Sequence, residues 1–289
     1  MRGAPLRRIP GLLGSALFFA ALSGAAWAAS SDGGYMPPDF SGLWSRTGNI
    51  RGSFDPVPGD TGAGPVMIDP RYPRQRPREG AGAGVVAVVQ GWVPDLSNPI
   101  LQPRTREALA AIAENELNDV PHPQNQTRCM PPGVPHILNL FDPMQVLQTP
   151  TEVLFLYSRD HHVRHVFLNR PHGENIGHSW WGESVGHYEG DTLVVDTIGL
   201  NDKTESDRFG TPHSDRIHVV ERYRLSGDGR VLEIVFTVED HVAFTMPWSA
   251  RSDYARDDWL FVETVCAENQ REFWPGRTIE LPVDETPDF

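Results

Sequence analysis

Histidine and aspartate side chains gather in two long polar segments, residues 169–182 and 201–216. Both exceed the two to five residues usual in hairpin loops, and long loops often carry function. Histidine exchanges protons near neutral pH, and a neighbouring aspartate orients its ring. We therefore expect an acid–base site in which His178 or His213 moves protons and Asp202 orients the ring. The alternative for His213 is a structural one, in which it caps the following strand through a backbone hydrogen bond.

A carboxylate is also predicted to point into the protein core. Apolar and polar side chains alternate over residues 217–225, and Glu221 falls on the apolar face. Such a group is either paired with a buried arginine such as Arg164 or held as an acid or base with a raised pKa. Pairing is favoured, because an unpaired buried charge is costly. Asp196 poses the same question at the end of a strand, where a turn-facing cap is the simpler interpretation.

The acid–base hypothesis also assigns substrate contacts. Arg164 would hold an oxyanion or carboxylate of a small substrate, whose aromatic or alicyclic part would stack on tryptophan. The other candidate binding residues are Trp180, Trp181, Trp248, Asn201 and Glu221. A lyase, an isomerase or a hydrolase would fit.

Two further motifs lack the setting that their chemistry needs. His161 and His165 have the spacing of a helical metal pair, but on a strand they would lie about 13 Å apart. Ser184 matches G-x-S-x-G, yet no helix-forming segment follows it. We expect no metal, no cofactor and no role for His161.

The elements that must position these residues are mainly strands. After Pro131, short apolar segments alternate with turn signals, which is typical of an antiparallel meander. Eight or more such strands close most economically into a barrel or a sandwich, because closure removes exposed edges. The predicted strands are residues 40–45, 153–157, 163–168, 184–188, 192–198, 217–225, 231–238, 242–246 and 259–266.

The chain before this meander reads differently. Residues 29–100 are rich in proline and glycine and predict an extended arm, with an apolar island at 85–93 expected to be buried. Residues 103–118 predict one helix, which Pro121 ends. We expect residues 101–289 to form one all-β, mainly antiparallel domain, a barrel or a strongly bent sheet, with the arm packed on it.

Residues 1–28 predict a signal peptide. Three arginines precede the apolar segment 12–27, and Ala26-Trp27-Ala28 is a cleavage signal. The general secretory route is the simpler interpretation, and the Arg7-Arg8 pair leaves a twin-arginine route open. Export would place the mature protein in a bacterial periplasm or outside the cell, with no second apolar segment to span a membrane.

The net charge of the chain argues against one class of partner. Cleavage would remove three arginines and no acid, which changes the formal charge from −13 to −16, and Lys203 is the only lysine. Nucleic-acid partners are therefore not expected, because phosphate binding needs clustered cations.

In an oxidising compartment Cys129 and Cys266 are expected to form one disulfide. Neither lies in a C-x-x-C motif, which argues against a redox or zinc role.

Several motifs together resemble a family of uncharacterised exported bacterial β-rich proteins. The motifs are Glu-Gly-Asp-Thr-Leu-Val-Val-Asp-Thr at 189–197, Asn201-Asp202, Pro212-His213-Ser214, Glu221-Arg222, Pro247-Trp248, Val265-Cys266 with Glu268-Asn269, and the proline-rich segment 129–135. The resemblance implies signature positions and no activity. Residues 40–44 are also similar to the Gly-x-Trp first strand of lipocalin-like barrels, which implies a lipocalin-like barrel with a ligand cavity.

Three hypotheses about function follow. The first is an exported, cofactor-free acid–base enzyme acting on a small molecule. The second is a lipocalin-like protein that binds a small molecule without turnover, for which a mostly apolar cavity would be needed. The third is a scaffold protein whose polar residues are only structural. Whether the chain is an enzyme depends on whether histidine, aspartate and arginine converge on one pocket.

Overall fold

The computed structural model describes residues 36–48, 53–59, 64–72, 92–118, 120, 122–258, 261 and 264–266. Contacts divide the chain into two units, Met1–Met36 and Pro37–Phe289. Everything below concerns the second unit. The predicted signal peptide lies outside the described residues, as do most of the predicted island 85–93 and much of the predicted strand 259–266.

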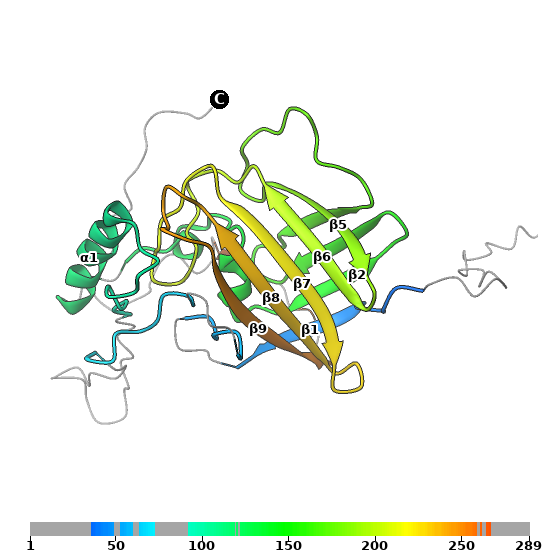
Figure 1. Ribbon diagram of the computed structural model, residues 1–289. Helices are drawn as coiled ribbons and strands as arrows, with labels where there is room; N and C mark the ends of the chain where they lie inside the picture. The colour runs from blue at the N-terminus through cyan, green and yellow to red at the C-terminus, as the bar shows by residue number, and fades with distance from the viewer. Residues whose placement is uncertain are drawn as a thin grey trace, which may run out of the picture. The chain divides into compact units, whose positions relative to one another are not determined.

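Nine strands form one closed barrel (Figure 1). Every neighbouring pair is antiparallel except β4 and β5, which are parallel. The strands are β1 (Gly42–Thr47), β2 (Met144–Gln148), β3 (Glu152–Tyr157), β4 (Val163–Leu168), β5 (Glu183–Glu189), β6 (Thr192–Ile198), β7 (His218–Ser226), β8 (Val231–Glu239) and β9 (Trp248–Asp257). The prediction of an all-β, mainly antiparallel barrel is confirmed.

One α-helix accompanies the barrel, as predicted. Helix α1 (Pro103–Leu117) starts with Pro103, whose missing N–H costs nothing in the first turn, and buries Leu109 and Ala113. It lies outside the barrel (Figure 1), where Gln102 just before it donates its backbone N–H to Ala243. Two short 3₁₀ helices, η1 (Asn125–Arg128) and η2 (His136–Asn139), precede β2. Among the described residues, no helix has the length and apolar character needed to cross a membrane.

Two strands were not expected, and one predicted strand is a turn. β9 was missed because two of its inward-facing residues, Ala250 and Ser252, are small and only weakly hydrophobic or polar. The alternation of apolar and polar residues is therefore not visible in its sequence. β2 is only five residues long. The predicted strand 242–246 is wrong, because Asp240 Oδ1 accepts the N–H groups of Val242 and Ala243 and folds the chain into a turn.

The segment predicted as an arm contributes to the barrel. β1 lies within it and pairs with both β2 and β9, so the barrel begins well before residue 101. At its far end, Trp92 and Val93 of the predicted island are buried. The predicted disulfide is confirmed, and it joins Cys129, directly after η1, to Cys266, 137 residues later. It ties the segment that follows β9 to the segment that precedes β2.

The parallel pair explains the length of residues 169–182. Parallel neighbours cannot be joined by a tight hairpin, so the chain after β4 must return before it enters β5. Gly182 ends this loop with a φ of +63°, and a Cβ atom there would lie 2.4 Å from the backbone oxygen of Ile198. Glycine is therefore required at the point where the loop enters the barrel.

We expect Gly182→Ala to lower the free energy of unfolding by about 2 kcal/mol or more, because the added methyl group meets backbone at a left-handed φ. Gly177→Ala is the matched control, since a Cβ at Gly177 in the same loop meets nothing within 4 Å. Urea unfolding of both variants checks this. Equal stabilities would contradict the requirement for glycine at position 182.

Candidate functional site

The barrel interior contains a buried ion pair. Arg164 on β4 and Glu221 on β7 point inward, and their side chains are 1% and 0% exposed. Arg164 Nη1 donates to Glu221 Oε1 at 2.9 Å, and Arg164 Nη2 donates to Glu221 Oε2. Glu221 thus occupies the apolar face, as predicted. Of the two alternatives for Glu221, the structure shows the first, a carboxylate paired with Arg164.

Three hydroxyl groups complete the pair. Arg164 donates from Nε to Ser184 Oγ at 3.1 Å and from Nη2 to Thr197 Oγ1 at 2.8 Å. Tyr223 donates its hydroxyl to Glu221 Oε1 at 2.7 Å. Burial disfavours the charge of Arg164, but the Glu221 carboxylate outweighs it and raises the pKa of Arg164 above its usual value. This geometry favours a structural ion pair over an arginine held ready for a substrate.

Aromatic side chains fill the space beside this pair. The rings of Phe155 and Tyr223 stack with centroids 5.1 Å apart. Trp248, a predicted substrate-binding residue, is 2% exposed and packs edge-on against Phe236 and Phe244. Trp248 is therefore a residue of the hydrophobic core that packs among aromatic rings, and it is not an open stacking surface for a substrate.

The predicted acid–base residues lie apart. His213 is buried, its Nδ1 lies 2.9 Å from the backbone oxygen of Ser214, and its Nε2 lies 2.6 Å from Thr204 Oγ1. The ring therefore donates from Nδ1 and accepts at Nε2, and burial lowers its pKa, which keeps it neutral. Asp202 and His178 are exposed. In the described part of the chain, no hydrogen bond or ion pair joins the three.

The remaining predicted binding residues are also dispersed. Trp181 stacks on Tyr157, with ring centroids 5.7 Å apart and planes within 2° of parallel. Trp180 is half-buried. Asn201 uses its side-chain oxygen to accept the backbone N–H of Lys203 within a turn. Among the described residues, no hydrogen bond or ring contact joins these three positions to Arg164.

A different set of residues does converge, on the outer face of the barrel. Asp196 on β6 lies between two imidazoles: its Oδ1 is 2.9 Å from His172 Nε2, and its Oδ2 is 3.0 Å from His218 Nε2. Glu183 on β5 and Glu239 on β8 lie beyond the two histidines, at 3.2 Å and 3.8 Å from their Nδ1 atoms. We call these five residues the outer histidine row.

Sequence reasoning placed His172 in a candidate loop but did not connect it to Asp196 or His218. The available signal was strand alternation, which puts Asp196 and His218 on the solvent side of two neighbouring strands. The contact itself depends on the register of β6 and β7, in which Thr197 faces Val219.

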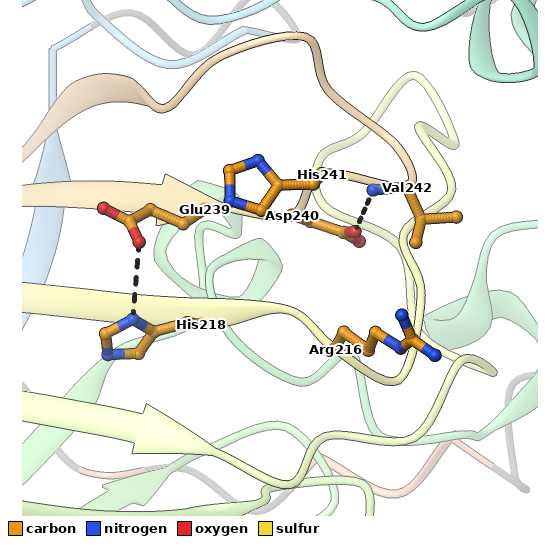
Figure 2. A pocket seen from close by; sticks show the side chains of 6 residues that line it. All are labelled: Arg216, His218, Glu239, Asp240, His241 and Val242. Carbon is orange, nitrogen blue, oxygen red and sulfur yellow. Dashed lines mark hydrogen bonds and ion pairs between the residues drawn. The ribbon is translucent and has the colours of Figure 1, made fainter.

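One end of this row borders a shallow depression of about 170 Å³, which we call the His218 depression (Figure 2). It is smaller than the roughly 300–1,000 Å³ of sites for drug-sized ligands. Figure 2 shows His218 and Glu239 facing each other on adjacent strands, with Arg216 and His241 beside them. The lining is completed by Asp240, whose carboxylate is engaged by Ser214, and by Val242.

The charges of the row are set by its hydrogen bonds. The bond to Asp196 raises the pKa of His218 above its ordinary value. The bond from His218 lowers the pKa of Asp196. The backbone N–H of Gly173 similarly lowers the pKa of Glu183. The two shifts together favour a protonated His218 beside an ionised Asp196.

Loop 201–216 builds a second, buried group of titratable residues. Its Glu205 lies 2.6 Å from His122 Nε2 and 3.9 Å from His136 Nδ1. Burial lowers the pKa of His136 to about 4. Burial also raises the pKa of Asp207 to about 6, although Thr211 and the backbone of Phe209 donate to it. No set of three or more His, Cys, Asp or Glu side chains within the described ranges is placed to hold a metal ion.

We expect Glu221→Gln to lower the free energy of unfolding by about 3–5 kcal/mol, because it leaves the Arg164 charge buried without its carboxylate. Replacing both residues, as Arg164→Met with Glu221→Leu, should recover much of that loss. Glu189→Gln, which breaks the exposed pair with Arg222, is the control and should change little. Denaturant unfolding measures all three. A Glu221→Gln protein as stable as the parent would show that the pair is not structural.

The buried titratable residues predict a specific pH dependence. The folded protein protonates His136 only near pH 4, against 6.5 ordinarily, so this site loses stability as the pH falls from 6.5 towards 4. Asp207 acts oppositely: its raised pKa contributes stability that is complete below 3.8 and lost as the pH rises through about 6. As the pH falls from 6 to 4, protonation of Asp207 stabilises the parent and offsets part of the loss at His136. Asp207→Asn lacks this gain, so its free energy of unfolding should fall more than that of the parent over this range.

The measurement is urea unfolding at several pH values in that range. Asp215→Asn, an exposed change in the same loop, should follow the parent curve. Identical curves for Asp207→Asn and the parent would contradict the raised pKa of Asp207.

Comparison with models of known protein families finds no match, and comparison with curated proteins finds no similar sequence. The resemblance to exported bacterial proteins therefore stays a prediction, and the function has to be argued from the geometry of the outer histidine row.

Proposed function

We propose that this chain is an exported protein that binds a small hydroxy or amino acid in the His218 depression and transfers a proton to or from it. The observation that carries the proposal is the fixed ring of His218. Its Nε2 is held by Asp196 at 3.0 Å, while its Nδ1 is 3.8 Å from Glu239, too far for a good hydrogen bond. Nδ1 faces Glu239 in this longer ion pair and is the ring atom that we assign to the ligand.

His218 would act as the acid–base group and Asp196 as the group that orients it. With Nε2–H donated to Asp196, the neutral ring presents a lone pair on Nδ1 that accepts a proton. Protonated, it donates from the same atom. The hydrogen bond to Asp196 raises the pKa of His218, which favours the protonated ring relative to a free imidazole. The reaction class is proton transfer next to a carboxylate, as in an isomerase or a lyase.

The charges around the depression support the substrate class. Arg216 is exposed and in the described part of the chain forms no ion pair, so its guanidinium is available for a carboxylate. Glu239 is an acceptor for a hydroxyl or ammonium group on the neighbouring carbon. The volume suits a molecule of this size. The tryptophans expected to stack an aromatic substrate do not line the depression, so an aromatic or alicyclic substrate has less support.

The test is a panel of lactate, malate, alanine and serine incubated with the protein in D₂O, with NMR detection of binding and of exchange at the α-carbon. We expect at least one probe to bind and exchange. Arg216→Gln should weaken binding about tenfold, the loss of one charge-assisted hydrogen bond. His218→Gln should reduce exchange by about 100-fold or more.

Arg224→Gln is the control for Arg216→Gln, because Arg224 lies on β7 and pairs with Glu233. Binding that survives in Arg216→Gln would contradict the assigned anchor. Binding without exchange in the parent would instead support the alternative, a ligand-binding protein without turnover. A parent that binds no member of the panel would overturn the proposal.

A further inference from the structure

We propose that His172 is a positioning residue of this site, and that through Asp196 it couples loop 169–182 to the protonation of His218. The coupling rests on the geometry of the outer histidine row alone. Its consequence for turnover rests on the proposed function.

Asp196 is shared between two imidazoles. One carboxylate oxygen faces His172, which the loop carries, and the other faces His218, which belongs to β7. Each oxygen is engaged at about the distance of a good hydrogen bond. The orientation of the carboxylate towards His218 is therefore set in part by His172.

His172 is itself held between two acceptors. Its Nδ1 is 3.2 Å from Glu183 Oε2, and its Nε2 is 2.9 Å from Asp196 Oδ1. A neutral imidazole has only one N–H, so it can donate to only one of two ionised carboxylates. Both bonds together need the doubly protonated ring. Protonation of His172 therefore completes the contact between the loop and the barrel.

Other contacts hold the loop when this one is lost. Glu183 also accepts the backbone N–H of Gly173 at 2.9 Å and a guanidinium N–H of Arg170 at 2.9 Å. Further along, Ser179 donates its backbone N–H to Gly199 at 2.9 Å. A change at His172 should thus leave the fold intact and alter the surroundings of its two partners, Asp196 and Glu183.

The sign of the coupling follows from charge. A positive charge on His172 offsets part of the Asp196 charge and repels a proton on His218, so the contact with His172 opposes protonation of His218. The other charged or titratable groups near the two rings are Glu183 from β5, Glu239 from β8, Arg170 from the loop, and Arg216, Asp240 and His241 beside His218. Of these, Glu183 is the one bonded to His172, and it loses that bond when His172 is replaced. Without His172, the whole Asp196 carboxylate serves His218, which should then titrate at higher pH.

The experiment is an NMR titration of the His218 ring in the ligand-free full chain. We expect His172→Gln to move the His218 midpoint to higher pH, whereas a residue that only anchors the loop would leave it unmoved. His187→Gln is the matched control, because His187 pairs with Glu189 elsewhere on the outer face. Asp196→Asn should move the midpoint to lower pH, and His172→Gln should then add nothing.

An unmoved His218 midpoint in His172→Gln would overturn the inference. So would a shift that persists in the Asp196→Asn background, because the coupling would then bypass the shared carboxylate. The titration uses no substrate, so its outcome is independent of the D₂O exchange experiment. If the titrations show the coupling but the protein exchanges no probe, the coupling stands and only the proposed reaction is refuted.

Discussion

The ion pair between Arg164 and Glu221 ties together four consecutive strands of the barrel. Arg164 lies on β4, and its partners Ser184, Thr197 and Glu221 lie on β5, β6 and β7. The residues that precede Ser184 and Thr197 are Glu183 and Asp196, which point to the other side of the same strands. The Arg164–Glu221 pair with its hydroxyl partners and the outer histidine row therefore lie on opposite faces of the same strands, and one strand register positions both. A slip by one residue would exchange the faces and destroy both.

This arrangement suggests why a polar group occupies a core that apolar side chains could have filled. Burying two charges stabilises a fold little, because the loss of hydration offsets most of their attraction. A guanidinium with partners in fixed directions does, however, distinguish one strand pairing from its neighbours. The distinction matters most between β4 and β5, where the pairing is parallel and no tight turn sets the register. Aromatic packing alone is less directional.

Strand periodicity was enough to predict the barrel and the inward position of Glu221. The helix followed from helical spacing and Pro121, and the pairing of Glu221 with an arginine from the cost of an unpaired buried charge. Strand periodicity failed for β9, whose inward Ser252 accepts from Arg46 and donates to the backbone of Leu138 instead of packing as a hydrophobe. Sequence reasoning selected His213 and did not consider His218. Local features marked His213, a polar loop and flanking turn residues, and those features describe a buried histidine held by Thr204 as well as a reactive one. The site at His218 depends on contacts between strands, which no local pattern contains.

The closure of the barrel has a consequence for how the chain assembles. Most neighbouring strands are also neighbours in sequence and can pair as soon as the connection between them forms, whereas β1 must meet β9, with Leu43 opposite Asp257. Contacts this distant in sequence form slowly, because the chain must be ordered before they stabilise it. Until the seam closes, β1 and β9 each present an unpaired edge, the surface through which strands of different molecules join. The lifetime of that open seam, rather than the stability of the finished barrel, is expected to set how readily newly made chains aggregate.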